Sequence, residues 1–440
     1  MNILKTVFKI ALMPLTKQAV FTAIGLILIS SYALSEKSTQ KELSQHEDGN
    51  SFVLINARVF TANGVIAPAA VLVENGIITD VGQKVTQDSV VPVIDIDGQT
   101  VSPGLIDAHT HSFYDSHLLD SLRFGVTTQL DMATDVSFMN DNRDQRSELE
   151  ETEYADFYSA GTIVTSPGGH GTQYGNPIPT VDSPAKAKEH IRARLEEGSD
   201  WIKIAYEPDN PFLTSVDKPT LTALIEAAHE QGSLALVHIS KLEAARDAVE
   251  AGADGLVHVF ADKVVDDELL ELMQGKKAFV IPTLSVIASI VGKNEAEHWA
   301  NKETGSLRLS RSQKNTITAD FEPYPGQEKF VKLNIAYENV RRMNNAGVPI
   351  LVGTDAPNSG TAHGVSIHDE LVHFINAGFT PAQALQSATS IPSKVFGLED
   401  RGMIEVGMRA DLIIFDGKPD ENILDTRKIT HIYKNGYEFE

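Results

Sequence analysis

The feature of this sequence that most constrains its fold is a regular alternation of short apolar runs and amphipathic segments between residues 105 and 355. The amphipathic segments have readable ends, since Asp217 precedes Lys218-Pro219 at the start of one that stops at Gly232. Alternating strands and helices indicate a parallel sheet covered by helices. Eight runs read as strands, which suits a closed (β/α)8 TIM barrel of the α/β class: Leu105–His111, Thr127–Asp131, Gly161–Pro167, Trp201–Tyr206, Leu234–His238, Gly255–His258, Ala278–Thr283 and Pro349–Asp355.

Both flanks of this alternating region have β texture. Short apolar runs broken by turn residues fill the stretch from Phe52 to Val101, where Asn75-Gly76 is a hairpin signal. The same texture returns at residues 411–415 and 429–436. We expect residues 51–102 and 403–440 to form one small β-sandwich subdomain, beside a barrel made of residues 103–402.

The N-terminal residues follow the order of a signal peptide. Basic residues Lys5, Lys9 and Lys17 precede an apolar run at residues 19–29, and small residues follow up to Ser35. The apolar run is shorter than the roughly 20 residues that a membrane span needs. We therefore expect a cleaved signal peptide at residues 1–35, a flexible leader at 36–50, a periplasmic or secreted protein, and no stable membrane span. An uncleaved anchor is the alternative.

The net charge and the cysteine content limit which partners and which metal ligands we expect. Asp and Glu outnumber Lys and Arg by 60 to 37, and the net charge of −23 would repel a phosphate backbone. We therefore expect a small-molecule substrate and no nucleic acid, and a homo-oligomer is possible. The chain has no cysteine, so any metal ligands must be histidine nitrogens and carboxylate-type oxygens.

Polar side chains that can bind metals follow the ends of five of the predicted strands. Each of them alone has an ordinary structural explanation, such as a hydrogen-bonded core histidine. Groups at the C-terminal ends of barrel strands, however, are expected to meet at one site. The six candidates are His109, His111, Lys203, His238, His258 and Asp355.

Lys203 lies within an apolar strand, where an ammonium group is costly to bury unless it is paired or chemically altered. Carboxylation by CO2 would turn it into an anionic carbamate with two oxygens that can bridge two cations. The alternatives are a salt bridge to a nearby acid, or an ammonium that reaches the end of the strand.

Five motifs occur in chain order: Asp107-Ala108-His109-Thr110-His111, Ile202-Lys203-Ile204, His238, His258 and Gly353-Thr354-Asp355-Ala356-Pro357. In this combination the sequence resembles the binuclear amidohydrolase superfamily, especially its imidazolonepropionase- and prolidase-like branch, over nearly everything after residue 50. The resemblance implies that one divalent metal is held by His109, His111 and Asp355, that His238 and His258 hold the other, and that a carboxylated Lys203 bridges them. Zinc suits such ligands best, with Mn2+, Co2+ or Fe2+ as alternatives.

The resemblance also implies a reaction, the cleavage of an amide or peptide-like C–N bond by a metal-activated hydroxide. Asp355 is the candidate proton acceptor and proton donor to the leaving amine. His170 follows the third strand and is a candidate donor to the substrate carbonyl or the tetrahedral intermediate, with a loop histidine as the alternative. Tyr206 and His363 are weaker candidates for substrate contact.

Two further functions remain open from the sequence. The same site would also suit an ester, a lactone or a phosphotriester, and an amidohydrolase-like barrel can instead serve as a non-catalytic binding protein. The residues around His238 and His258 differ from those of many prolidase-like relatives, so a dipeptidase assignment does not transfer. The polar stretch from Leu284 to Gly326 is a candidate lid.

Overall fold

The computed structural model describes residues 50–85, 91–175, 177–293, 297–300, 309–322 and 330–440. These residues belong to one structural unit, residues 49–440. The expected signal peptide, and the expected leader except Asn50, lie outside the described residues. Within the described ranges, no helix is both long enough and apolar enough to cross a membrane.

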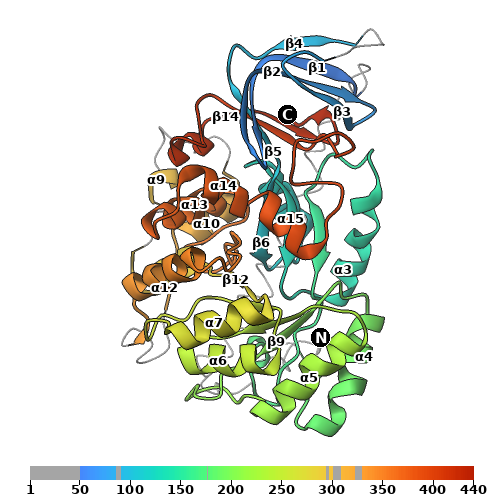
Figure 1. Cartoon of the computed structure of the whole chain (residues 1–440). Helices are drawn as coiled ribbons and strands as arrows, with labels where there is room; N and C mark the ends of the chain where they lie inside the picture. The colour runs from blue at the N-terminus through green and yellow to red at the C-terminus, as the bar shows by residue number, and fades with distance from the viewer. Residues whose placement is uncertain (1–49, 86–90, 176, 294–296, 301–308, 323–329) are drawn as a thin grey trace, which may run out of the picture. The chain divides into compact units, whose positions relative to one another are not determined.

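Two parallel sheets form the middle of the unit (Figure 1). One has the order β6 (Leu105–Thr110), β7 (Val126–Asp131) and β8 (Asp156–Ser159). The other has the order β12 (Phe279–Ile281), β11 (Gly255–Val257), β10 (Ala235–His238) and β9 (Ile202–Ala205). Nearly every residue of these strands is buried, which is the pattern of a parallel sheet covered on both faces.

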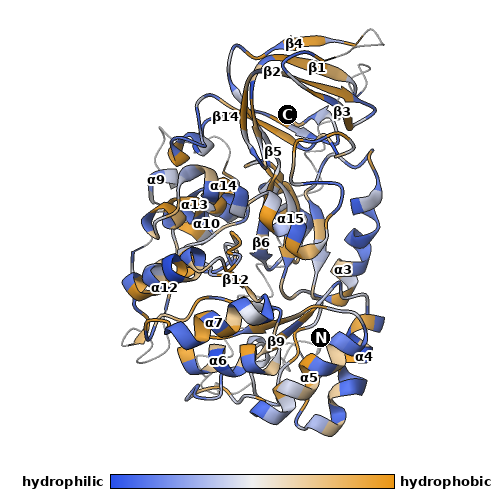
Figure 2. Cartoon of the chain, viewed as in Figure 1, coloured by the Kyte–Doolittle hydropathy of each residue, from blue (hydrophilic) through white to orange (hydrophobic). Residues whose placement is uncertain are grey.

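Helices follow the strands and cover them. Most of the helices have apolar positions on one side and polar positions on the other, which Figure 2 shows as mixed orange and blue ribbons. The helices are α2 (Asp115–Leu122), α3 (Val136–Arg143), α4 (Ala187–Glu196), α5 (Lys218–Glu230), α6 (Leu242–Ala251), α7 (Asp267–Lys276), α8 (Leu284–Ile290), α9 (Glu297–Ala300), α10 (Arg311–Ile317), α12 (Leu333–Asn345), α13 (Ser366–Asn376), α14 (Pro381–Ser387) and α15 (Ser390–Phe396).

Local capping chemistry explains several helix ends. The Asp217 side chain accepts a hydrogen bond from the Thr220 backbone N–H at 2.9 Å, so α5 begins where the sequence predicts. Gly252 ends α6 with a φ of 100°, a left-handed conformation that favours glycine. The α6 helix begins at Leu242.

Two of the eight predicted strands differ from the expectation. The third, predicted at 161–167, begins earlier as β8 and continues only as an isolated parallel bridge between Val164 and Ile204. The eighth, predicted at 349–355, is a segment with a parallel bridge from Ile350 to Val280. The ladder is interrupted there, because the Val352 N–H donates to the Ser387 carbonyl and the Thr354 N–H donates to the carboxylate of Asp107.

Backbone hydrogen bonds place the 350–356 segment beside strands of both parallel sheets. The Leu351 N–H donates to Val280 of the β12 region, and Ala108 of β6 donates to the Val352 carbonyl, both at 2.9 Å. A further bridge joins Thr110 to Ala356. The segment that carries Asp355 therefore lies beside the end of β6.

Strands from both ends of the described chain share one sheet. Its order is β15 (Tyr437–Glu438), β14 (Ile429–Lys434), β13 (Leu412–Phe415), β5 (Thr100–Pro103), β1 (Phe52–Thr61), β2 (Gly64–Glu74) and β3 (Ile77–Gly82), with β4 (Val93–Asp95) on β1. The β5 strand pairs antiparallel with β13 and parallel with β1. Leu54, Val71, Val101, Leu412 and Ile414 belong to the buried cluster of this sheet.

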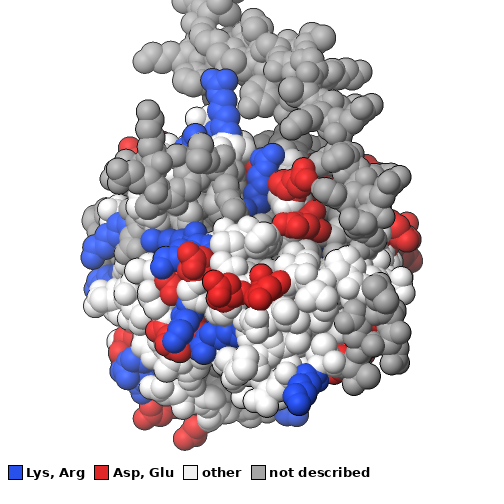
Figure 3. All heavy atoms as spheres, turned by 90° about the horizontal axis from the view of Figure 1, so that it is seen from above, with Lys and Arg blue, Asp and Glu red and all other residues white. Residues whose placement is uncertain are grey.

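A group of buried charges links this sheet to β8. The carboxylate of Asp156 accepts hydrogen bonds from Arg401 and from the Lys434 ammonium, the latter at 3.0 Å. Lys434 is fully buried and also contacts Asp411 at 3.3 Å. Exposed charges, by contrast, are interspersed over the face drawn in Figure 3, where acidic and basic side chains lie next to one another.

Candidate metal centre

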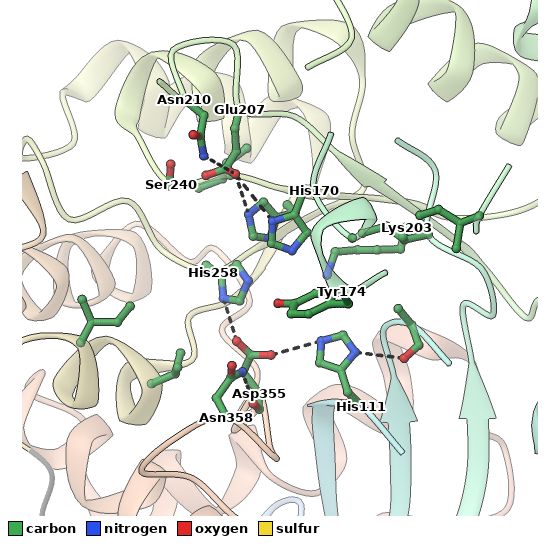
Figure 4. A pocket seen from close by; sticks show the side chains of 18 of the residues that line it. His111, His170, Tyr174, Lys203, Glu207, Asn210, Ser240, His258, Asp355 and Asn358 are labelled. Atoms are coloured by element: carbon green, nitrogen blue, oxygen red, sulfur yellow. Dashed lines mark hydrogen bonds and ion pairs between the residues drawn. The ribbon is translucent and has the colours of Figure 1, made fainter. Parts of the chain in front are cut away.

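A cavity of about 1150 Å³ opens beside the C-terminal ends of the parallel strands. Five of the six predicted ligands line it, and they come from separate strands or the loops after them (Figure 4). These lining residues are His111, Lys203, His238, His258 and Asp355, and the sixth candidate, His109, is fully buried directly behind them. His170 also lines the cavity.

The tightest cluster in the cavity consists of His109, His111 and Asp355. The Nε2 atoms of the two histidines are 3.3 Å apart, and each lies 3.2 Å from Oδ1 of Asp355. Ligands of a tetrahedral zinc ion, bound at about 2.1 Å, are separated by about 3.4 Å. The three atoms therefore have the spacing of three ligands on one side of a small divalent cation.

Hydrogen bonds prepare these imidazoles for metal binding. Nδ1 of His111 lies 3.0 Å from the Ala133 carbonyl, so this nitrogen carries the proton and leaves the Nε2 lone pair free. Nδ1 of His258 lies 2.7 Å from Oγ1 of Thr283. Burial lowers the pKa of His109 to about 3 and holds that of His258 well below its usual range. The rings of His109 and His258 are therefore neutral at pH 7, and the neutral imidazole is the form that binds metals.

Asp107 fixes the two segments that carry this cluster. Its carboxylate accepts hydrogen bonds from the backbone N–H of His109 at 3.2 Å and of Thr354 at 3.0 Å, and from the Thr354 hydroxyl at 2.7 Å. Burial raises the pKa of Asp107 to about 7. This side chain therefore ties the β6 end to the segment of Asp355, which sets the distance between the ligands.

Lys203 reaches the cavity from β9 and is only 2% exposed. Burial lowers its pKa to about 8, an effect that the more distant carboxylates of Asp355 and Asp131 partly oppose. Among the described residues, no carboxylate lies within 4.0 Å of its ammonium. Figure 4 shows the side chain extended into the cavity, toward the histidines.

A second group of potential ligands consists of His170, Glu207 and His238. Oε2 of Glu207 lies 3.7 Å from Nδ1 of His170 and 3.6 Å from Nε2 of His238, and the two rings are 4.3 Å apart. Figure 4 shows the carboxylate of Glu207 directed at His170. The family resemblance instead groups His238 with His258, whose rings are 4.6 Å apart. His238 thus lies between both candidate partners.

Glu207 is a site residue that the sequence reasoning missed. Side chains alternate along a strand, so positions 203, 205 and 207 share a side and 206 faces the other way. Lys203 and Glu207 accordingly line the cavity. This alternation was the feature of the sequence that could have identified Glu207, although β9 ends at Ala205, two residues before it.

The two predicted substrate contacts, Tyr206 and His363, lie outside the lining of the cavity. The Tyr206 ring belongs to the buried core, and its hydroxyl donates to Asp247 at 2.8 Å, as its opposite parity requires. His363 is buried and stacks on His117 with ring centroids 4.3 Å apart. Both side chains therefore have packing contacts and neither faces this cavity.

Comparisons with known proteins agree with this architecture. A model described as the amidohydrolase family matches residues 100–438. Ochratoxinase from Aspergillus niger is 25% identical over 321 residues, a match that spans 64% of this chain and 60% of the enzyme. Imidazolonepropionase from Geobacillus kaustophilus is 26% identical over 396 residues, 80% of this chain and 85% of the enzyme. A solved Xaa-Pro dipeptidase with bound methionine in its active site has a TM-score of 0.72 at 22% identity and covers 89% of this chain and 100% of that one.

Proposed function

Because this chain belongs to the amidohydrolase family, we propose that it is a metal-dependent hydrolase that cleaves an amide or peptide-like C–N bond. The observation that carries the proposal is the convergence of His109, His111 and Asp355 at mutual distances of 3.2–3.3 Å beside a large cavity. The names of the related ochratoxinase and imidazolonepropionase are those of enzymes, which supports a catalytic role over a purely binding one.

We also propose that the parallel strands form a closed eight-stranded barrel. The bridges Val164 to Ile204, Val280 to Ile350 and Thr110 to Ala356 support a circuit in which both parallel sheets and the 350–356 segment close into eight strands. The likeness to the solved dipeptidase supports the TIM barrel fold. The sheet shared by both ends of the described chain would then form the β-sandwich subdomain.

His109, His111 and Asp355 would hold one divalent ion, and His238 and His258 the second, with carboxylated Lys203 between them. Zinc fits the nitrogen and oxygen donors and the spacing of the first cluster. When bound, the two ions supply Lewis acidity to the amide carbonyl and lower the pKa of water. The buried Lys203, with no close carboxylate among the described residues, supports its carboxylation.

The protein's own side chains would move and hold the protons. Asp355 accepts a proton from the attacking water on a carboxylate oxygen and returns it to the leaving nitrogen. His170 lines the cavity beside Glu207. Its Nε2 would donate to the substrate carbonyl oxygen in the tautomer that carries the proton on that atom.

The reaction is tested with purified protein and added Zn2+, with N-acyl amino acids, dipeptides, aryl esters and phosphotriesters as substrates. We expect hydrolysis of amides that is lost on chelation and restored by Zn2+. Cleavage of esters or phosphotriesters with no amide cleavage would overturn the proposed bond specificity. Absence of all turnover in the metal-loaded protein would instead support a binding protein.

The bridging role of Lys203 has its own test. We expect Lys203→Ala to lower the bound metal from about two ions to about one per chain, measured by elemental analysis, because the bridge to the second ion is lost. Lys241→Ala is the control, since Lys241 lines the same cavity without belonging to the metal cluster. Full metal content and normal activity in Lys203→Ala would contradict the bridge.

We also propose export from the cytoplasm, on the basis of the N-terminal sequence. N-terminal sequencing of protein recovered from the periplasm or medium should begin after residue 33 or 35. Recovery of an intact N-terminus would contradict cleavage.

A further inference from the structure

Aromatic side chains that the fold leaves exposed surround the candidate metal centre. Phe113, Tyr174 and Phe212 are 38%, 71% and 52% exposed, and all three line the cavity that contains the proposed ligands. They lie on three separate loops, after β6, after the Val164 bridge and after β9. Apolar surface that is left in water around a cavity indicates a binding surface for an apolar group.

A second apolar surface faces the same cavity from α8. Val286, Ile287 and Ile290 of this helix line the cavity. Glu370 holds the start of the helix, because its buried carboxylate accepts hydrogen bonds from the backbone N–H of Leu284 at 2.8 Å. The apolar wall is therefore anchored to α13, which carries Glu370.

The polar lining is concentrated at the metal centre, with a few charged side chains elsewhere. Those charges are mainly acidic, since Asp135, Asp209 and Glu322 line the cavity together with Lys241. The Lys241 ammonium donates to the backbone carbonyl of Asp209 at 3.3 Å and lies 5.3 Å from the centre of the Phe330 ring. Acidic surroundings disfavour an anionic group on the substrate there, so an uncharged apolar group fits better.

From this arrangement, and resting on the proposed amide hydrolysis, we propose that the substrate is an amide with a bulky, uncharged apolar group. This group would lie between α8 and the aromatic residues Phe113, Tyr174 and Phe212. The cavity volume of about 1150 Å³ exceeds the needs of a small polar amide and suits a ligand of drug-like size.

The substrate class is tested with two series of amides on the Zn2+-loaded enzyme. One series varies the acyl group from acetyl to hexanoyl, benzoyl and naphthoyl at a fixed amine, and the other varies the amine at a fixed acyl group. We expect kcat/KM to rise in at least one series by up to about fourfold for each buried methylene. Equal kcat/KM values across both series would overturn the proposal.

A variant and a matched control locate the apolar surface. In the series that shows the size preference, we expect Phe212→Ala to lower kcat/KM for the bulkiest substrate about tenfold, while the value for the smallest substrate changes less than twofold. Tyr114→Ala is the control, because Tyr114 is also an exposed aromatic residue, at 66%, and lies outside the cavity lining. Equal effects of the two variants, or equal losses for both substrates in Phe212→Ala, would contradict this location.

Binding of an inert probe separates this inference from the proposed reaction. N-phenyl-1-naphthylamine is uncharged, apolar and fluorescent when it leaves water, and it contains no amide. We expect it to bind the metal-loaded protein, with weaker binding to Phe212→Ala and unchanged binding to Tyr114→Ala. Binding without any amide cleavage would reject the reaction and retain the apolar site, whereas cleavage without size preference or probe binding would reject the apolar site alone.

Discussion

At the scale of single residues, buried carboxylates hold the backbone segments and lie beside the imidazoles of the candidate centre. Asp107 ties the segment of His109 to that of Asp355, and Glu207 lies between His170 and His238. A carboxylate on the far nitrogen of a metal-binding histidine fixes its proton and its direction. Asp107 thus sets the distance between two segments of the candidate centre, and Glu207 lies where it would orient the rings of His170 and His238.

Asp355 has the most demanding role of the proposed ligands, because it would bind metal and also carry the proton. We expect Asp355→Asn to keep the fold and lose most of its turnover, since an amide cannot accept the proton from water. Circular dichroism checks the fold, and the rate of amide hydrolysis measures the turnover. A near-native rate in this variant would remove Asp355 from the reaction.

Glu207 should affect activity through the histidines beside it. We expect Glu207→Gln to weaken the binding of one metal ion or lower kcat about 10–100-fold, the range for partners of metal-binding histidines. Glu207→Asp keeps the charge and should recover part of the loss. Metal titration followed by activity assays measures both effects, and equal behaviour of the Gln and Asp variants would show that the carboxylate is not needed.

The sequence predicts that the strand-end candidates meet, but not which side chains lie beside them. His109 and His111 can be placed together because side chains two apart in a strand share one side, and the structure brings them to 3.3 Å. Glu207 and Tyr206 lie beyond the end of β9, where only the alternation of side chains, continued past the strand, indicates which of the two faces the cavity. The stacking of His363 on His117 is a tertiary contact between distant segments.

At the scale of elements, α8 connects the metal centre with the apolar wall. Thr283 directly precedes the helix in a left-handed conformation, with a φ of 50°, and its hydroxyl contacts His258. Glu370 of α13 accepts hydrogen bonds from the backbone and hydroxyl of Ser285 at 2.6 and 2.7 Å. The predicted lid segment therefore begins with a firmly held helix whose residues line the cavity.

Removal of the Glu370 carboxyl group should loosen this helix. We expect Glu370→Leu to lower the free energy of unfolding by about 1–3 kcal/mol, because the buried N–H groups of Leu284 and Ser285 lose their acceptor. Urea unfolding measures the change. Substitution of the exposed Glu338, which pairs with Arg341 on the surface of α12, by Leu is the control and should have little effect.

The order of strands and helices was easier to predict from the sequence than the exact extent of each strand. Regular apolar runs mark β6, β7 and β9–β12 in the sequence, and the structure has strands there. The eighth segment is equally apolar, but its Val352 N–H donates to Ser387 and its Thr354 N–H to Asp107. These distant acceptors interrupt the ladder, and no local pattern reveals them.

At the scale of the whole described unit, buried charges join the sheet of both chain ends to the parallel strands. We expect Lys434→Met to lower the free energy of unfolding by about 3–5 kcal/mol, since Asp156 and Asp411 lose a buried partner. Lys188→Met is the matched control, because Lys188 pairs with Glu230 at 2.8 Å but is exposed, and it should cost at most about 1 kcal/mol. Equal unfolding midpoints for the two variants would show that the buried cluster adds nothing to stability.

The pairing of β5 with β13 also has a consequence for how the chain is made. Thr100–Pro103 leaves the ribosome long before Leu412–Phe415, its antiparallel neighbour, has been translated. Until the last residues emerge, one edge of β5 has no partner, and an open edge invites pairing with other chains. Nascent chains, or chains truncated before β13, should therefore be the forms that aggregate, because β13 covers this edge.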